Sequence, residues 1–230
     1  MSTFLVESKN RIKRQPNRGH YDKATIYQII DEAMICHVAF VQDGQPFVIP
    51  ALHARKDDQL LIHGASTSRL LNHIQAGNVV SITITIVDGI VLAKTVFNQS
   101  VNYRSVVLFG KGRLIENEDE KWQSLAHLTE QLMPGVWQTA RQPTTTELKA
   151  TSLVSISIES ASAKIRSGPP KDSGEDQMLP VWAGVLPVKQ IIQTPSTADY
   201  TDPDMPIPDY VMAYMAEKNK DDAGSLPEPK

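Results

Sequence analysis

The spacing of apolar residues changes from a helical to an alternating period near residue 35. After the N-cap candidate Asp22, apolar residues recur at helical spacing and predict a short amphipathic helix: Ile26, Ile29, Ile30 and Ala33. Residues 35–41 and 46–53 then read as strands, and the Asp43-Gly44 dipeptide between them is typical of a hairpin turn. The N-terminal part therefore predicts a helix followed by a β-hairpin.

Alternation and turn residues place further elements along the chain. The remaining strands are expected at residues 60–63, 79–87, 90–97, 103–115 and 153–158. The remaining helices are expected from Arg69 to Gly77, from Asn117 to Pro134 and around residues 210–217. Asp88-Gly89 predicts the turn of a second hairpin, residues 55–59 a polar turn and residues 164–174 a loop. Gly110 and Gly112 mark a bend or bulge in the long strand.

The order of these elements predicts the fold class. Strands joined by hairpin turns, with helices inserted between them and no alternating βαβ pattern, favour a mainly β protein: an antiparallel barrel with covering helices. We expect one such domain at residues 1–194. Residues 195–230 are expected to be a proline-rich C-terminal extension with a short helix and a polar tail.

Composition and charge restrict the class of protein. Of the 230 residues 41% are hydrophobic and 21% charged, in the ordinary range of globular proteins. No apolar run approaches the ~20 residues of a membrane span, and the basic N-terminus lacks a signal-peptide pattern, so we expect a cytoplasmic protein without a membrane partner. A net charge of −3 argues against a nucleic-acid partner, although the basic arm could hold a polyanion. The single cysteine, Cys36, excludes an intrachain disulfide and is interpreted as a small buried residue.

The segment from His63 to Arg69 is the strongest candidate for a binding site. It combines small residues, three hydroxyl groups and an arginine at a predicted helix start, which favours a phosphate: Gly64, Ala65, Ser66, Thr67 and Ser68 precede Arg69. A serine-capped helix with a surface arginine explains the same residues equally well. The other histidines lack paired metal-ligand spacing, so no metal site is predicted. Ser66, His63 and Asp58 could be drawn as a hydrolase triad, but no nucleophile elbow surrounds the serine.

Four blocks, in a fixed order, resemble one known family. They are residues 45–50, 63–69, 102–107 and 181–184. Together they resemble flavin-nucleotide-binding proteins of the pyridoxamine 5′-phosphate oxidase-like group, which includes relatives linked to nitroimidazole resistance. The resemblance implies an FMN-binding split β-barrel with Greek-key-like antiparallel strands. It further implies a homodimer with one FMN per subunit at the interface.

The resemblance also implies roles for particular residues. The strand beside the isoalloxazine ring would contain Val48, Ile49 and Pro50. The ribityl chain and phosphate would be held by His63, Gly64, Ala65, Ser66, Ser68 and Arg69. A strand approaching the flavin of the neighbouring subunit would begin with Tyr103, Arg104 and Ser105, and Trp182 would lie near the ring. Two alternatives stay open: Trp182 as a core or interface residue, and Arg104 as a solvated strand residue or an ion-pair partner.

Two departures from the true oxidases bear on activity. Leu70 stands where those enzymes usually carry a lysine that contacts phosphate, and residues 185–193 contain only Lys189 where they carry an arginine and a histidine. We therefore do not expect oxidation of pyridoxamine phosphate.

The leading hypothesis is an FMN-dependent oxidoreductase. It would pass electrons from a reduced nicotinamide, or from its substrate, to a small-molecule acceptor. The alternatives are a non-catalytic flavin carrier or sensor, and a haem-binding relative in which His53 or His63 ligates iron. A nucleic-acid module that uses the basic arm is the least favoured hypothesis.

Overall fold

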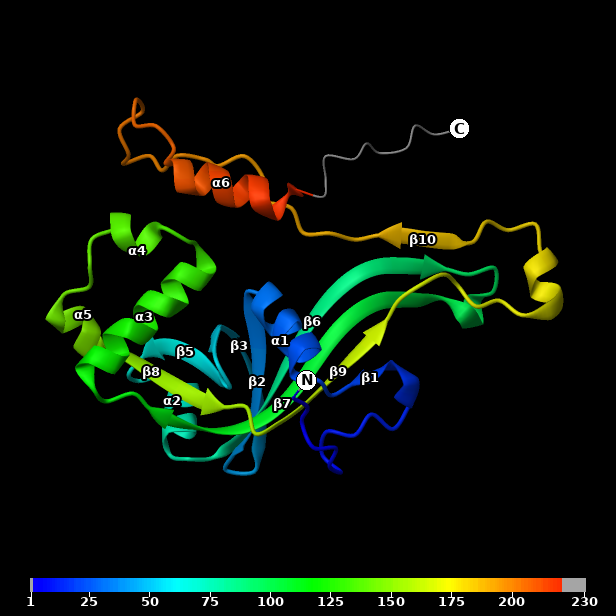
Figure 1. The fold of residues 1–230 in the computed structure, drawn as a ribbon, viewed down its shortest axis with the longest axis horizontal. Helices are drawn as coiled ribbons and strands as arrows, with labels where there is room; N and C mark the ends of the chain where they lie inside the picture. Colours follow the sequence, from blue (N-terminus) through cyan, green and yellow to red (C-terminus); the bar gives the residue numbers. More distant parts are fainter. Residues whose placement is uncertain (1, 221–230) are drawn as a thin grey trace. The chain divides into compact units, whose positions relative to one another are not determined.

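The computed structural model describes residues 2–220 (Figure 1). The chain divides into two compact units, the first formed by Met1–Leu128 with Pro143–Lys189 and the second by Thr129–Gln142 with Gln190–Lys230. The domain boundary expected after residue 194 stays a prediction, because compact clustering does not show which segment folds independently. No helix within residues 2–220 is both long enough and apolar enough to cross a membrane.

The first unit is built on an antiparallel sheet. Its strands are β1 (Gly19–His20), β2 (Ile35–Gln42), β3 (Gln45–Leu52), β4 (Ala54–Lys56), β5 (Gln59–Ala65), β6 (Val79–Leu92), β7 (Ser100–Leu114), β8 (Thr151–Ser157), β9 (Ser160–Arg166) and β10 (Gly184–Pro187). The main order is β3-β2-β6-β7-β8-β5-β4, with β9 also paired to β7 and β10 to β6. Within the described residues, β3 and β4 end this order without pairing to each other, so the sheet is not closed. The predicted mainly β, split-barrel class is confirmed.

Helices cover the sheet or form the second unit. They are α1 (Lys23–Glu32), α2 (Arg69–Gln75), α3 (Glu118–Leu132), α4 (Val136–Thr139), α5 (Thr145–Ala150) and α6 (Asp209–Lys218). Asp22 caps α1 as predicted, since its carboxylate accepts a hydrogen bond from the Thr25 N–H at 2.8 Å. The sequence did not predict α5, although Thr144 and Glu147 form a capping box at its start.

The core lies between the sheet and the helices α1 and α2. Ile26 and Ile30 of α1 and Ile74 of α2 are fully buried against strand residues such as Ile82. Cys36 is also buried, and burial raises the pKa of its thiol to about 12, so the predicted role as a small core residue is confirmed.

The second hairpin turn was predicted in the wrong place. β6 continues through Asp88 and Gly89 to Leu92, and the chain reverses at a short 3₁₀ turn, Val96–Asn98. Gly89 lacks the positive φ that a tight hairpin turn requires, and the β6–β7 register shifts there as in a bulge. The result is a long two-stranded arm, named here the β6–β7 arm (residues 87–101), against which β10 pairs (Figure 1).

Two other stretches also differ from the prediction. β9 continues to Arg166 inside the predicted loop 164–174, and β4 overlaps the predicted polar turn at 55–59. β9 opens with alternating serine and alanine, a pattern without the branched apolar residues that signal a strand. Residues 160–163 are nevertheless buried, because small side chains fit between β7 and β1.

Gly110 and Gly112 lie where β7 changes neighbours. β7 pairs with β9 up to Phe109 and with β8 from Gly112 onward. A Cβ atom at Gly110 would overlap the Ser157 carbonyl oxygen, so the strands approach each other more closely than any side chain allows. These glycines therefore permit the change of direction that splits the barrel.

Candidate functional site

β3 offers a free edge next to the predicted cofactor segment. Among the described strands it pairs only with β2, through a two-residue turn in which Asp43 and Gly44 have φ of 52° and 75°. In such hairpins the residue pair that flanks the turn is hydrogen-bonded, and hydrogen-bonded and non-hydrogen-bonded pairs then alternate along the two strands. Pro46, Val48 and Pro50 belong to non-hydrogen-bonded pairs, so their backbone groups point away from β2. The two prolines have no N–H, which leaves Val48 as the donor on this part of the edge. Its side chain is 65% exposed, so both backbone and side chain are open to a ligand.

The start of α2 lies against β3. The Arg69 guanidinium lies over the Phe47 ring, 4.5 Å from the ring centre, and therefore joins two of the predicted blocks, residues 45–50 and 63–69. Arg69 forms no ion pair with any described residue, so its charge is available to an anion. Phe47 was not among the predicted contacts, although its place between Pro46 and Val48 in the first block was a usable signal.

The two serines before α2, Ser66 and Ser68, already form hydrogen bonds within the protein. The Ser66 N–H donates to the Ala150 carbonyl at 3.2 Å and the Ser68 N–H to the Ala65 carbonyl at 2.9 Å. The Ser68 hydroxyl caps α2 by accepting from the Leu71 N–H at 3.5 Å, but its own proton remains free to donate. Both interpretations of this segment are therefore compatible: Ser68 is a helix cap and can also contact an anion.

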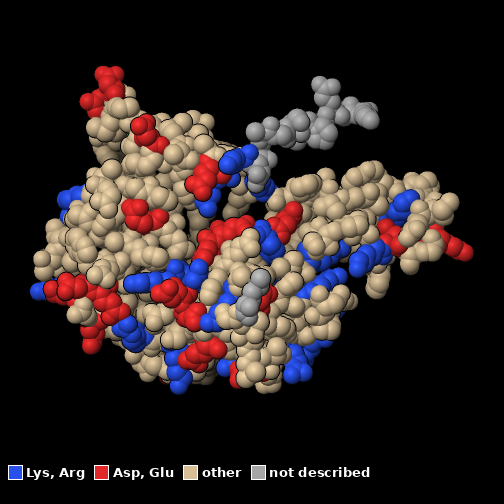
Figure 2. Space-filling view, viewed as in Figure 1, with Lys and Arg blue, Asp and Glu red and all other residues tan. Residues whose placement is uncertain are grey.

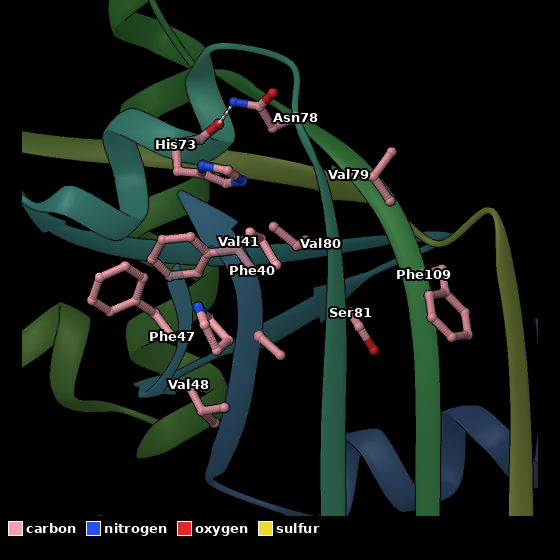
Figure 3. Close-up of a pocket in the computed structure, with 12 residues that line it drawn as sticks. Phe40, Val41, Phe47, Val48, His73, Asn78, Val79, Val80, Ser81 and Phe109 are labelled. Atoms are coloured by element: carbon pink, nitrogen blue, oxygen red, sulfur yellow. Dashed lines mark hydrogen bonds between the residues drawn. The ribbon is translucent and has the colours of Figure 1, made fainter. Parts of the chain in front are cut away.

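The free edge of β3, residues 63–66 and the start of α2 with Ser68 and Arg69 are together named the cradle here. An apolar hollow of about 500 Å³ lies beside it (Figure 3). Phe47 and Phe40 stack with ring centres 5.4 Å apart, and the His73 ring lies 4.5 Å from Phe40. Val48 and Phe109 line the same hollow. The cationic cradle at Arg69 is thus continuous with an aromatic surface, the combination that suits a ligand with one planar apolar end and one anionic end.

The predicted residues 103–105 lie elsewhere, at the base of the β6–β7 arm. Tyr103, Arg104 and Ser105 pair with residues of β6 on one side and β9 on the other. Arg104 forms ion pairs with Glu32, and with Asp88 at 2.7 Å, which raise its pKa above the usual range for arginine. Its guanidinium is therefore occupied by carboxylates, as the ion-pair alternative anticipated.

Trp182 also lies beside the arm rather than beside α2. It precedes β10, which pairs with the distal half of β6, and its side chain is 65% exposed. The indole ring packs against Gly184, where an added Cβ would lie 2.6 Å from two ring carbons. The predicted residues thus form two groups in one chain, a cradle on β3, β5 and α2 and a second group on the arm (Figure 1).

The two histidines considered as iron ligands differ in access. His53 is 3% exposed, its Nε2 lies 2.9 Å from the Ile30 carbonyl oxygen, and burial lowers its pKa. His63 lies near the end of β5 with an exposed side chain, and desolvation lowers its pKa. Only His63 combines a neutral imidazole with access from outside.

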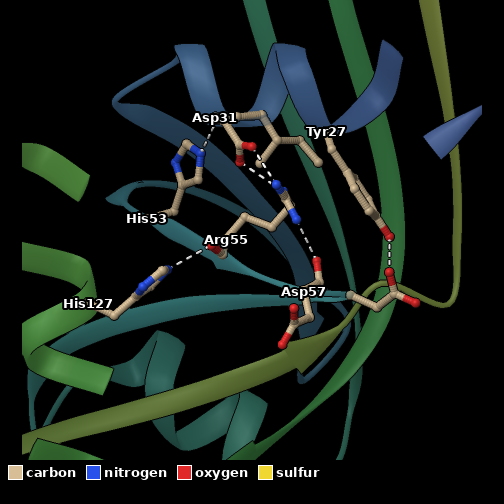
Figure 4. A network of polar contacts seen from close by, with 8 residues as sticks. Tyr27, Asp31, His53, Arg55, Asp57 and His127 are labelled. Atoms are coloured by element: carbon tan, nitrogen blue, oxygen red, sulfur yellow. Dashed lines mark hydrogen bonds and ion pairs between the residues drawn. The ribbon is translucent and has the colours of Figure 1, made fainter. Parts of the chain in front are cut away.

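A polar network fastens α1 to the turn between β4 and β5 (Figure 4). Asp58 accepts hydrogen bonds from the Tyr27 hydroxyl and from the Lys23 ammonium, the latter at 2.5 Å. Arg55 pairs with Asp31 and lies over the Tyr27 ring, 4.3 Å from its centre. The Lys23 and Tyr27 hydrogen bonds lower the pKa of Asp58, while burial and Asp58 raise that of Tyr27. Because the polar groups satisfy one another, we assign this network to structure.

The solved structures that resemble this chain include two that match nearly its whole length. The flavocytochrome Anf3 from Azotobacter vinelandii is 34% identical, with a TM-score of 0.85 over 90% of this chain and 96% of that one. The FAD and heme binding protein from Mycobacterium smegmatis is 32% identical, with a TM-score of 0.83 over 86% of this chain and 97% of that one. A protein described in connection with 5-nitroimidazole antibiotic resistance, from Bacteroides thetaiotaomicron, is 22% identical with a TM-score of 0.55 over 64% of this chain and 86% of that one, and shows likeness of fold alone.

An open antiparallel sheet with covering helices defines a split-barrel protein. Residues 22–165 match the family described as pyridoxamine 5′-phosphate oxidase. The chain therefore belongs to this family, and the resemblance found in the sequence is confirmed. No curated protein matches the sequence significantly.

Proposed function

We propose that this chain is a flavin-binding oxidoreductase. The observation that carries the proposal is the Arg69 guanidinium, which lies over Phe47 beside the free edge of β3 and the aromatic hollow and forms no ion pair within residues 2–220. A flavin nucleotide has a planar ring, a polar ring edge and a phosphate, and these three features match the three parts of the cradle. The names of the two near-full-length relatives, a flavocytochrome and an FAD and heme binding protein, support the same class.

The individual roles follow the chemistry of each group. The Val48 N–H and the carbonyls of Val48 and Pro50 suit the donors and acceptors on the flavin ring edge. Residues 63–66 suit the ribityl chain, and Ser68 with Arg69 suits the phosphate. When bound, the flavin would supply the hydride chemistry, and the protein would position it and exclude competing reactions.

FMN and FAD both fit these residues because they share the ring, the ribityl chain and the first phosphate. The sequence resemblance implied FMN, whereas the relative from Mycobacterium smegmatis is named for FAD. Because that relative is 32% identical and is matched over 97% of its length, we propose FAD as the first candidate and FMN as the second.

We also propose a homodimer with the flavin at its interface. In one chain the cradle and the group containing Tyr103 and Trp182 lie on different elements, as expected if the arm of one copy completes the cradle of the other. The tip of the arm supports this, since Val96 and Phe97 are 91% and 94% exposed. Large apolar side chains exposed to this degree are typical of a surface that a partner covers.

A second candidate cofactor is haem, which the names of both near-full-length relatives support. His63 fits an axial ligand because it is accessible and its pKa is lowered. His73 fits on other grounds, because it lies at the apolar hollow against Phe40. Replacement of each histidine by alanine should identify the ligand by loss of the Soret band from one variant and not from the other.

The absorption spectrum of the purified protein tests the proposed function. A flavin spectrum is expected, and mass spectrometry of the material released by heat separates FAD from FMN. Bleaching of the flavin by a reduced nicotinamide without oxygen supports an oxidoreductase, whereas no reduction by any donor supports the carrier or sensor. Protein that is colourless and takes up no added flavin would refute the proposal.

A further inference from the structure

A buried arginine at the end of β9 forms no ion pair with an acid among the residues that the structure describes. Arg166 is the last residue of β9, opposite Tyr103 in the register with β7, and it is 6% exposed. Its Nη1 donates to the Asn102 side-chain oxygen and, at 3.4 Å, to the Gly168 carbonyl oxygen. Both acceptors are neutral, so the hydrogen bonds of Arg166 within the described residues offer its positive charge dipoles and no negative charge.

The remaining donors of Arg166 are not fully enclosed. Nε and Nη2 make no hydrogen bond to residues 2–220, and neither is among the fully enclosed polar atoms that lack a partner. Asn102 cannot serve them, because its oxygen accepts from Nη1 and its Nδ2 donates to the Gly168 carbonyl at 3.2 Å. One edge of the guanidinium is therefore bonded to the protein, and the other keeps donors that are neither bonded to residues 2–220 nor fully enclosed.

The other well-placed arginines of the sheet do have carboxylate partners. Arg55 pairs with Asp31, Arg113 with Glu120, and Arg104 with both Glu32 and Asp88. The Arg104 side chain is 25% exposed, so it is better solvated than Arg166 and yet has two counter-ions. Burying a charge without a counter-ion is costly, which makes the exception at Arg166 informative.

The surroundings of Arg166 add positive charge. β1 pairs Gly19 with Lys164, which brings the preceding Arg18 to the end of β9. Burial lowers the pKa of Arg166, and the positive charge of Arg18 lowers it further. Two further basic residues are close in sequence: Lys164 on β9 and Lys171 in the loop after it. Asp172, the acid next in the loop, is engaged with the N–H groups of Lys94 and Thr95. In Figure 2, Lys and Arg side chains gather over the region where Figure 1 places β1 and the segment before it.

We propose that Arg166 and Arg18 form an anion site that takes a phosphate group of a nucleotide ligand. A planar guanidinium with one free edge binds phosphate oxygens in a bidentate manner, and a second arginine suits a dianion better than a single carboxylate. The site is separate from the Ser68–Arg69 cradle, since it is formed by β7, β9 and the 3₁₀ turn Pro16–Arg18.

Two nucleotides could supply this phosphate. One is a reduced nicotinamide that serves as electron donor, and the other is the flavin itself, bound mainly to a second copy. A nicotinamide bound here would be the electron donor of the proposed oxidoreductase, so this possibility rests on the proposed function. A flavin phosphate bound here would complete the flavin site shared by two copies. The anion site does not depend on either, because a protein that binds no flavin should still bind free pyrophosphate here.

Isothermal titration calorimetry of the purified full-length protein with pyrophosphate, NADP⁺ and NAD⁺ measures the dissociation constant of each ligand and tests the site. Replacement R166Q should weaken pyrophosphate binding by about tenfold or more, through loss of a charge-assisted bidentate contact. The control R14Q removes the same charge from an exposed position in the same basic segment and should change affinity by about twofold or less. Preference for NADP⁺ over NAD⁺ that disappears in R166Q would identify the 2′-phosphate as the ligand group.

Two further measurements keep the test decisive. R18Q removes the less buried arginine and should also weaken binding, and melting temperatures show whether each variant is folded. A folded R166Q that is purified with less flavin than R14Q would identify the flavin as the source of the phosphate. If R166Q and R18Q both retain the pyrophosphate affinity and the flavin content of the unaltered protein, the anion site does not exist.

Discussion

At the scale of single residues, the partner of a charged side chain decides what it can do. Arg69 and Arg104 were both expected to contact the flavin, but Arg104 is bound by Glu32 and Asp88, whereas Arg69 lies over Phe47 without an acid. The sequence could indicate the type of residue at each block. It could not indicate the partners, because Glu32 lies 72 residues from Arg104 and meets it only in the folded chain.

His53 should make stability depend on pH. Burial lowers its pKa in the folded state, so between that value and the unfolded value of about 6.5 the unfolded chain binds more protons, and stability rises with pH. The free energy of unfolding in urea should therefore be lower at about pH 5.5 than at about pH 7.5. H53Q keeps an N–H for the Ile30 carbonyl but does not titrate, so its curve should be flatter.

The matched control for this experiment is H37Q, on an exposed position of β2. It should keep the pH dependence of the unaltered protein. A slope that is equal in H53Q and H37Q would show that His53 does not titrate differently on folding.

At the scale of elements, alternation and turn residues predicted most strands, and tertiary contacts explain the errors. Asp88-Gly89 has the composition of a tight turn, but β10 covers Gly89 and Arg104 holds Asp88, so β6 continues through both. β9 was not predicted, because its serines and alanines show no apolar alternation. Local sequence does not contain the neighbouring strand that makes such a segment a strand.

Gly110 should be intolerant of any side chain. Because a Cβ there would overlap the Ser157 carbonyl oxygen, G110A should lower the free energy of unfolding by about 3 kcal/mol. The neighbouring K111A, on an exposed position, should change it by about 0.5 kcal/mol or less. Chemical denaturation of the two variants measures the difference, and equal stabilities would show that the strands can separate at Gly110 without cost.

At the scale of the whole molecule, the candidate site consists of two parts on one chain. The sequence predicted both sets of residues, because each belongs to a recognisable block. It could not show that the cradle is formed by β3, β5 and α2 while Tyr103 and Trp182 lie at the β6–β7 arm. This arrangement is the basis for the proposed dimer.

Mixed dimers test whether two copies share one site. R69Q damages the cradle and W182A damages the group of residues beside the arm, so each variant alone should be purified with little flavin. Co-expressed with different tags, they should form a heterodimer with one intact and one doubly damaged site, and its flavin content should approach half that of the unaltered protein. A heterodimer as poor in flavin as its parents, or a monomer in light scattering, would contradict the shared site.

The dissociation constant of the flavin for R69Q, compared with the unaltered protein, is the most direct measurement. Flavin-free protein is titrated with FAD and FMN, and R113Q, which removes an exposed arginine paired with Glu120, is the control. Loss of the charge-assisted contact should cost R69Q about 1.5–3 kcal/mol of binding free energy, or roughly tenfold to 150-fold in the constant, and leave R113Q unchanged. A folded R69Q that binds both flavins as tightly as the unaltered protein would contradict a phosphate cradle at the start of α2.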